Sequence, residues 1–166
     1  MAAEAAGITP IVRPATFSPE AIAQMMDRGA LGVQVPHVCS AADARRVVQA
    51  VKFHPLGQRS LAVGTRAGGY GYGLSRADYV AEANRETLVC VQWEDAEALR
   101  HTDEMLAVEG VDVYFIGPSD LSQSLGYPGH PEAPPVRQAI ATALERIRVA
   151  ARIAGSAGGT AALRDY

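Results

Sequence analysis

Polar residues that could do chemistry come directly after apolar runs of this sequence. The first run ends in Arg13, the third in Glu94, and the fourth in a Gly-Pro-Ser turn followed by Asp120. In parallel α/β folds ligands bind at the carboxyl ends of the strands, so we expect these side chains to face one common site. Two carboxylates brought together repel each other, and a divalent cation between them removes that conflict. The pattern therefore predicts a metal site with an arginine beside it.

The predicted metal is a hard divalent cation held by Glu94 and Asp120. Mg²⁺ and Mn²⁺ bind one or two carboxylates and complete an octahedron with water or substrate oxygens. Co²⁺ also accepts oxygen-rich sites, so the choice among the three ions stays open. Arg13 would supply a fixed positive charge for an oxyanion on the substrate. The turn at 117–119 would offer backbone N–H groups to a substrate carboxylate.

Each of these residues also has a structural interpretation. A carboxylate after a strand is often the N-cap of the next helix, and Asp120 and the Glu94-Asp95 pair both allow that role. Asp95 is the better cap, which leaves Glu94 for another task. Arg13 could form a surface ion pair. His37 follows an apolar run, and we expect it to be packed and hydrogen-bonded in a structural role.

Four apolar runs alternate with helical patterns and must position these side chains. The runs cover residues 8–14, 31–38, 86–94 and 110–120, and the helical patterns cover 18–29, 40–51, 95–106 and 134–155. Continuous apolar runs are typical of strands buried on both faces, and alternation with helices implies right-handed crossovers and a parallel sheet. We therefore expect an α/β fold, either a doubly wound sheet or a (βα)8 barrel.

Composition narrows the classes of function. The chain has 166 residues, 48% of them hydrophobic, and a net charge of -3, which predicts one globular domain over 1–166. No basic run indicates nucleic acid or a membrane surface as a partner, and no apolar run approaches a membrane span. With no leader sequence recognised, the cytoplasm is the expected location. Cys39 and Cys90 lie in apolar runs and are expected to be free thiols. No G-x-G-x-x-G follows a strand, which argues against a dinucleotide site.

Several segments resemble the HpcH/HpaI aldolase family in order and spacing. They are "IVRP", "DRGALGVQVPHV", "VQWEDAEAL" and "VEGVDVYFIGPSDLSQSLGYPGHP", and the resemblance runs from about Ile11 to about Gly155. It implies a metal-dependent class II aldolase acting on 2-oxo acids, with a (βα)8 barrel of the pyruvate-binding type. Only strands three to six of that barrel are covered, so the resemblance implies a fragment or a shortened barrel. Its open strand edges imply either self-association or dependence on the missing segments.

The resemblance also assigns roles to residues. Glu94 and Asp120 match the two metal-binding carboxylates, and Arg13 matches the arginine that binds the 2-oxo group and stabilises the pyruvate enolate. The implied substrate-binding set is Arg13, Gln92, Gly117 and Ser119. Asp27 matches an aspartate that reaches into a neighbouring subunit and orients its catalytic histidine, which implies a homo-oligomer. The Gly-Glu-His turn that carries this histidine has no match in the sequence.

The implied reaction is cleavage of a 4-hydroxy-2-oxo acid to pyruvate and an aldehyde. Two alternatives stay open. The first is a citrate-lyase-like acyl-CoA lyase, which would act only on a CoA thioester. The second is a non-catalytic remnant that binds metal or pyruvate without turnover.

Overall fold

The computed structural model describes residues 2–158, which form two compact units. The first unit contains the described residues up to Val35 together with Arg46–Val89, and the second contains Pro36–Arg45 and the described residues from Cys90 onward. Helix α3 (Ala41–Val51) and strand β3 (Leu88–Trp93) each begin in one unit and end in the other. Among the described helices, none has the length and apolar character that a membrane crossing requires.

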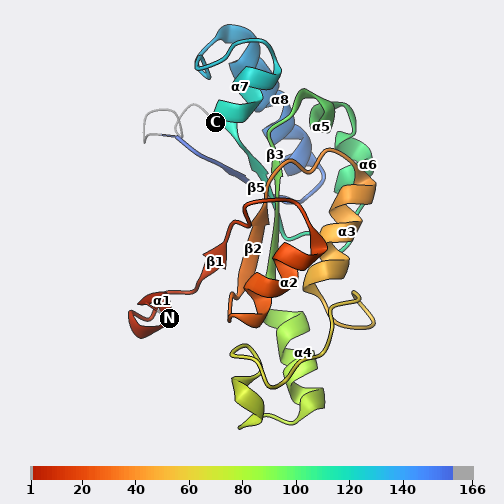
Figure 1. Cartoon of the computed structure of the whole chain (residues 1–166). Helices are drawn as coiled ribbons and strands as arrows, with labels where there is room; N and C mark the ends of the chain where they lie inside the picture. The colour runs from red at the N-terminus through yellow and green to blue at the C-terminus, as the bar shows by residue number, and fades with distance from the viewer. Residues whose placement is uncertain (1, 159–166) are drawn as a thin grey trace. The chain divides into compact units, whose positions relative to one another are not determined.

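The first unit is built on a pair of parallel strands (Figure 1). Its elements are α1 (Ala2–Ala5), β1 (Ile11–Val12), α2 (Pro19–Asp27), β2 (Gly32–Val35), the short 3₁₀ helix η1 (Gly69–Gly71) and α4 (Arg76–Glu86). Helix α2 packs on β2 and buries Ile22 and Met26, which lie one turn apart on the same face. The Leu88 N–H donates to the Leu31 carbonyl at 3.0 Å, so β3 starts beside β2.

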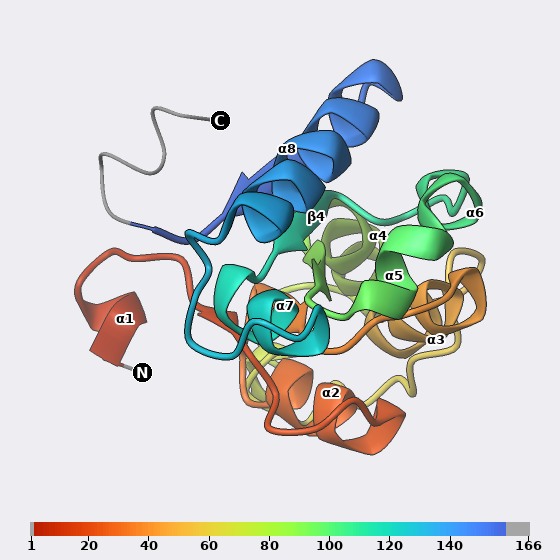
Figure 2. The same cartoon turned by 90° about the horizontal axis from the view of Figure 1, so that it is seen from above.

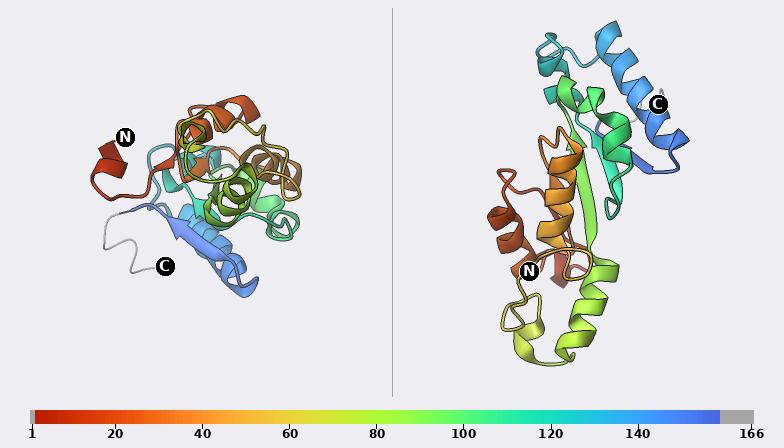
Figure 3. Two further views of the ribbon diagram at one scale, coloured as in Figure 1. Left: turned by 90° about the horizontal axis from the view of Figure 1, so that it is seen from below. Right: turned by 90° about the vertical axis from the view of Figure 1, so that its right-hand side faces the viewer.

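The second unit contains the larger share of the parallel sheet (Figures 2 and 3). Its further elements are α5 (Ala96–Arg100), α6 (Thr102–Leu106), β4 (Val113–Ile116), α7 (Pro118–Ser124), α8 (Pro134–Val149) and β5 (Ile153–Ser156). Strand β4 lies between β3 and β5, which gives the sheet order β1-β2-β3-β4-β5. Helix α8 packs on β4 and β5 through Val136, Ile140, Ala143 and Ile147, whose spacing is that of one helical face.

The expected parallel α/β arrangement is confirmed, as are two helix starts that follow from cap chemistry. The Ser18 hydroxyl accepts the Ala21 N–H at 3.0 Å ahead of Pro19, the first residue of α2. At the start of α3, the Ser40 hydroxyl accepts the Asp43 N–H at 3.1 Å and donates to the Asp43 carboxylate at 2.7 Å. Both arrangements satisfy N–H groups that have no partner inside the helix.

The structure differs from the sequence expectation in four elements. The helix expected over 95–106 is two short helices, because the chain leaves helical geometry at His101. Helix α4 lies in a region to which the sequence analysis assigns no element, and α7 replaces a simple turn after β4. A fifth strand, β5, pairs in parallel with β4, whereas the sequence predicts only four strands. The end of the sequence, residues 159–166, lies outside the described residues.

Candidate functional site

The carboxyl end of β3 carries a buried carboxylate. Side chains two residues apart in a strand point to the same face, so Gln92 and Glu94 lie together while Trp93 points away from them. The Gln92 Nε2 group donates to Glu94 Oε2 at 2.9 Å. Glu94 is 1% exposed, and Gln92 is buried too. Gln92 therefore contacts Glu94 directly, whereas the family resemblance assigns it to the substrate.

The loop that joins β2 to α3 holds the other oxygen of this carboxylate. The backbone N–H of His37 donates to Glu94 Oε1 at 3.0 Å, and the Val38 N–H donates to the Gln92 carbonyl at 3.2 Å. His37 has a φ of +53°, a left-handed conformation that side chains other than glycine seldom adopt. Backbone strain of this kind is retained where the surrounding structure fixes it, commonly at functional sites. Two independent donors thus fix the orientation of Glu94.

The imidazole of His37 lies among acidic groups and is open to solvent. Its Nδ1 is 3.0 Å from Asp95 Oδ2 and 3.5 Å from Glu94 Oε1, and the side chain is 55% exposed. The hydrogen bond with Asp95 raises the pKa of His37 above its ordinary value, and the charges of Glu94, Asp95 and Asp120 act in the same direction. Partial burial opposes them. The hydrogen bonding expected of His37 is confirmed, but its ring is exposed and not packed.

The side chain of Asp95 binds this loop and does not cap a helix. Asp95 stands at the N-cap of α5, yet its carboxylate makes no hydrogen bond to the first turn of that helix. It accepts instead from the Cys39 thiol at 3.4 Å, besides its contact with His37. Burial, followed by the charge of Asp95, raises the pKa of the Cys39 thiol to about 12. Ser124 of α7 takes over the capping task, because its hydroxyl accepts the Ala96 N–H at 2.9 Å.

A glycine at the end of β4 leaves room for Glu94. A Cβ atom at Gly117 would lie 2.7 Å from Glu94 Oε2 and 2.9 Å from Glu94 Cβ, closer than real Cβ contacts allow. The Gly117 N–H donates to the Trp93 carbonyl at 3.2 Å. This N–H is therefore engaged in the sheet, which corrects the expectation that it is available to a substrate carboxylate. Ser119 and Asp120 are exposed residues in the first turn of α7. They precede Leu121, whose N–H donates to the Gly117 carbonyl in the first hydrogen bond of the helix.

The donor set of the second unit fits a hard divalent cation. Residues 2–158 contain no group of three or more His, Cys, Asp and Glu side chains that could hold a metal ion. Mg²⁺ does not need such a group, because it binds one or two carboxylates and keeps water or substrate oxygens as its other ligands. Glu94 offers a carboxylate oriented by two N–H donors, beside a glycine that leaves space at Oε2. Asp120 lies close enough for its charge to act on His37.

Two other predicted residues belong to the first unit. Arg13 follows β1 directly and is exposed. Asp27, the last residue of α2, forms an ion pair with Arg59 at 2.8 Å. Arg59 has a side chain that is only 2% exposed, and its guanidinium lies 4.7 Å from the centre of the Phe53 ring. The roles predicted for Arg13 and Asp27 stay predictions.

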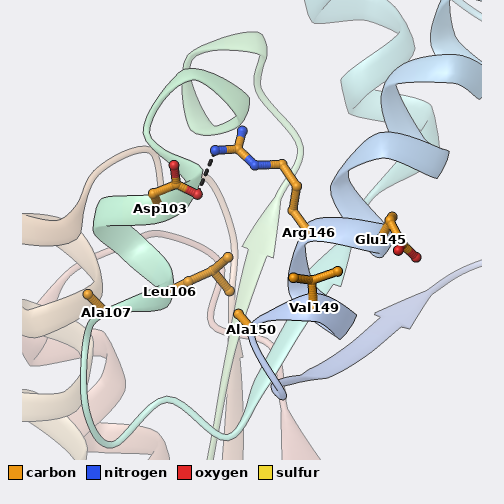
Figure 4. Close-up of a pocket in the computed structure, with 7 residues that line it drawn as sticks. All are labelled: Asp103, Leu106, Ala107, Glu145, Arg146, Val149 and Ala150. Atoms are coloured by element: carbon orange, nitrogen blue, oxygen red, sulfur yellow. Dashed lines mark ion pairs between the residues drawn. The ribbon is translucent and has the colours of Figure 1, made fainter.

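A hollow of about 500 Å³ in the second unit lies apart from the predicted residues. It is formed by α6 and α8, and Figure 4 shows Asp103 and Arg146 paired across its rim. Their contact distance is 2.6 Å. The floor is aliphatic, with Leu106 and Val149, and none of the residues predicted to bind metal or substrate lines it. The hollow is therefore separate from the carboxylate cluster at the end of β3 and is not the predicted metal or substrate site.

The sequence has extensive similarity to known proteins. The model of the family described as HpcH/HpaI aldolase/citrate lyase matches residues 1–162. The 2-keto-3-deoxy-L-rhamnonate aldolase of Salmonella paratyphi B is 43% identical over 148 residues, which cover 88% of this chain and 54% of the relative. The chain therefore spans about half the length of the curated relatives it matches.

Solved structures share the fold. An HpcH/HpaI aldolase/citrate lyase family protein from Burkholderia cenocepacia J2315 superposes with a TM-score of 0.90 and 34% identity, covering 98% of this chain and 65% of that one. The citrate synthase SbnG has a TM-score of 0.85 and 29% identity, covering 98% of this chain and 62% of its own. These likenesses confirm the expected α/β fold of the (βα)8 type.

Proposed function

Because this chain belongs to the HpcH/HpaI aldolase/citrate lyase family, we propose that it supports the cleavage of a 4-hydroxy-2-oxo acid into pyruvate and an aldehyde. The observation that carries the proposal is the buried Glu94 carboxylate, which the His37 N–H and the Gln92 amide hold at the end of β3. A carboxylate fixed in this way is a preorganised ligand, because its orientation is set before anything binds. The aldolase named among the relatives supports the same class of reaction.

In this proposal Glu94 and Asp120 hold a divalent cation, Mg²⁺ or Mn²⁺ in the first place and Co²⁺ as a further candidate. When bound, the ion would polarise the 2-oxo group and stabilise negative charge on its oxygen. Gln92 and the His37 backbone keep the Glu94 carboxylate in place. Gly117 leaves the space that this carboxylate needs. The second unit thus supplies both proposed metal ligands and their supports.

The bond changes balance without an oxidant or reductant. The C3–C4 bond of the substrate breaks, the proton of the C4 hydroxyl leaves, and C4 becomes the aldehyde carbon. The electron pair of the broken bond forms the enolate of pyruvate, which gains a proton at C3. Arg13 is proposed to bind the 2-oxo group and to stabilise this enolate through its fixed charge.

Two further parts of the proposal involve the substrate carboxylate and a second copy of the chain. The backbone N–H groups of Ser119 and Asp120, at the start of α7, would bind the pyruvate carboxylate, with Gly117 shaping the turn. Asp27 would act across the interface of a homo-oligomer, although the Gly-Glu-His turn whose histidine it would orient has no match in this sequence. The Arg59 guanidinium supports this carboxylate by an ion pair of 2.8 Å, so Asp27 ends α2 with a fixed orientation.

The test measures pyruvate release from a 4-hydroxy-2-oxo acid with added Mg²⁺ or Mn²⁺, for this chain and for its Asp120→Ala variant. We expect turnover that depends on the ion and is lost in the variant. Circular dichroism of both proteins controls for folding. If a folded chain binds the ion but releases no pyruvate, the proposal of catalysis is wrong and the binding remnant replaces it.

A second candidate is an acyl-CoA lyase related to the citrate lyases. It is favoured by the family description and by the likeness to a citrate synthase of known structure. A parallel assay with a CoA thioester of a 3-hydroxy acid, in which the release of acetyl-CoA is measured, separates the two candidates. Turnover of the thioester alone would support the lyase, and turnover of the 2-oxo acid alone would support the aldolase.

A further inference from the structure

Two side chains of the loop between β2 and α3 meet on one carboxylate oxygen. Asp95 Oδ2 lies 3.0 Å from His37 Nδ1 and accepts the Cys39 thiol at 3.4 Å. A carboxylate accepts hydrogen bonds, so the imidazole donates through its Nδ1–H. Burial, followed by the charge of Asp95, raises the pKa of Cys39 to about 12, so the thiol keeps the proton that it donates. Asp95 therefore holds the loop at two positions that are two residues apart.

One of the loop residues that Asp95 holds is also the one that binds Glu94. The His37 N–H donates to Glu94 Oε1 at 3.0 Å, and the φ of His37 is +53°. A left-handed backbone at a residue other than glycine costs free energy and persists only where surrounding contacts fix it. Asp95 supplies two such contacts, and the Val38 N–H, bound to the Gln92 carbonyl at 3.2 Å, supplies a third. Without Asp95, we expect the loop to relax and the N–H to leave Glu94.

We propose that Asp95 is a positioning residue, which fixes the loop between β2 and α3 and thereby orients Glu94, one of the proposed metal ligands. Asp95 acts through His37 and touches neither the ion nor the substrate. Its role depends on accepting hydrogen bonds and not on its charge, because donated hydrogen bonds attach the loop to it. The inference deepens the proposed function by naming what orients a metal ligand, and it rests on that proposal.

Three variants separate the hydrogen bonds of Asp95 from its charge. Asp95→Ala removes both. Asp95→Asn is the conservative variant, because its amide oxygen still accepts hydrogen bonds while the charge is gone. Glu97→Ala is the matched control, since it removes an exposed carboxylate two residues further along the chain, in the first turn of α5.

The first measurement needs neither metal nor substrate. Hydrogen exchange followed by NMR in the metal-free protein reports how firmly the His37 N–H is bound. We expect exchange of this amide to be about 10-fold faster in Asp95→Ala, the effect of one lost hydrogen bond, and unchanged in Asp95→Asn and Glu97→Ala. The Gly117 N–H, which is bonded within the sheet, is the reference, because a general loosening of the unit would accelerate it too. Equal acceleration of both amides in Asp95→Ala, or none at His37, would overturn the inference.

The second measurement connects the loop to the metal site through the affinity for Mn²⁺, determined by isothermal titration calorimetry. We expect Asp95→Ala to lower this affinity about 10-fold, the low end of the effect of changes around a metal ligand, and Asp95→Asn to leave it close to that of the unaltered chain. Glycine at position 37 adopts the left-handed backbone without strain and keeps the N–H. In a His37→Gly background, Asp95→Ala should therefore have a smaller effect, because the two residues act in series.

Together the two measurements distinguish a wrong inference from a wrong proposed function. If no protein of the series binds Mn²⁺ while the exchange of the His37 amide responds as expected, the proposed metal site is wrong and Asp95 still orients Glu94. If Mn²⁺ binds equally well to the unaltered chain and to Asp95→Ala, the positioning role is wrong and the metal site remains. Equal losses of affinity in Asp95→Ala and Asp95→Asn would assign the effect to charge and would also refute the inference.

Discussion

At the scale of single residues, the site is defined by how one carboxylate is held. Glu94 could be singled out from the sequence because it follows an apolar run and because Asp95, beside it, has the better position for capping the next helix. Its supports could not be identified in the same way. The His37 N–H reaches Glu94 from a point 57 residues earlier in the chain, and this contact depends on a left-handed loop. A pattern of apolar and polar residues does not encode such a contact.

The same limit explains why the capping role predicted for Asp95 is wrong. The preference of aspartate for N-caps is a local rule, and the position of Asp95 before α5 satisfies it. The side chain instead binds His37 and Cys39, which come from another part of the sequence. Ser124, 28 residues after Ala96, provides the capping oxygen. A tertiary contact has replaced the local one here.

Gly117→Ala tests the space reserved for Glu94. The added methyl would lie 2.7 Å from Glu94 Oε2, so the carboxylate or the end of β4 must move. The backbone of Gly117, with φ -94° and ψ 93°, admits alanine, so the effect is steric and not conformational. We expect divalent-cation affinity to fall by about 10- to 100-fold, as for other changes next to a metal ligand. Isothermal titration calorimetry with Mn²⁺ measures this affinity.

The control is Gly64→Ala in the first unit, where a Cβ would have no neighbouring atom within 4 Å. That variant should bind Mn²⁺ as the unaltered chain does. Unchanged Mn²⁺ affinity in a folded Gly117→Ala variant would show that Glu94 is not the ligand.

At the level of secondary structure, elements whose sequence shows a cap residue or a clear apolar pattern lie where they are predicted. Elements that lack both features are missed. Helices α2 and α3 begin at cap residues that the sequence displays. Helix α4 buries no residue completely, so its sequence has no apolar stripe to reveal it. Strand β5 has only four residues, two of them alanine and glycine, and it forms because β4 offers a paired edge.

A double hydrogen bond from one asparagine fastens α4 within the first unit. Asn84 Oδ1 accepts the Phe53 N–H at 2.7 Å, and its Nδ2 donates to the Phe53 carbonyl at 3.1 Å. Lys52 adds a bond of 2.9 Å to the Asn84 carbonyl. Asn84→Ala removes both side-chain bonds and leaves the Phe53 N–H without its partner, while the Phe53 carbonyl still accepts from the N–H groups of Leu56 and Gly57. We expect the free energy of unfolding to fall by about 1–3 kcal/mol, measured by urea denaturation followed by circular dichroism.

Glu82→Ala is the matched control, since Glu82 is an exposed residue of the same helix. Its effect should stay within about 0.5 kcal/mol, as for surface substitutions in general. Equal stabilities of Asn84→Ala and Glu82→Ala would contradict the importance of this pair of bonds.

At the scale of the whole chain, two elements join the compact units covalently. Helix α3 runs from Ala41–Arg45 in the second unit into Arg46–Val51 in the first, and β3 runs from Leu88–Val89 into Cys90–Trp93. Unfolding of one unit would have to interrupt a helix and a strand that continue into the other. Interrupting a helix or strand in its interior removes backbone hydrogen bonds on both sides of the break. We therefore expect the two units to unfold in one transition.

Trp93 provides the probe for this expectation, because it is the only tryptophan of the chain and is fully buried in the second unit. Asn84→Ala weakens the first unit only. If unfolding is cooperative, this variant should lower the urea midpoint seen by Trp93 fluorescence as much as the midpoint seen by circular dichroism. A Trp93 midpoint that stays unchanged while circular dichroism shows an earlier loss of helix would mean that the first unit melts alone. In that case α3 and β3 break at the boundary, and the carboxylate cluster around Glu94 persists without the unit that carries Arg13 and Asp27.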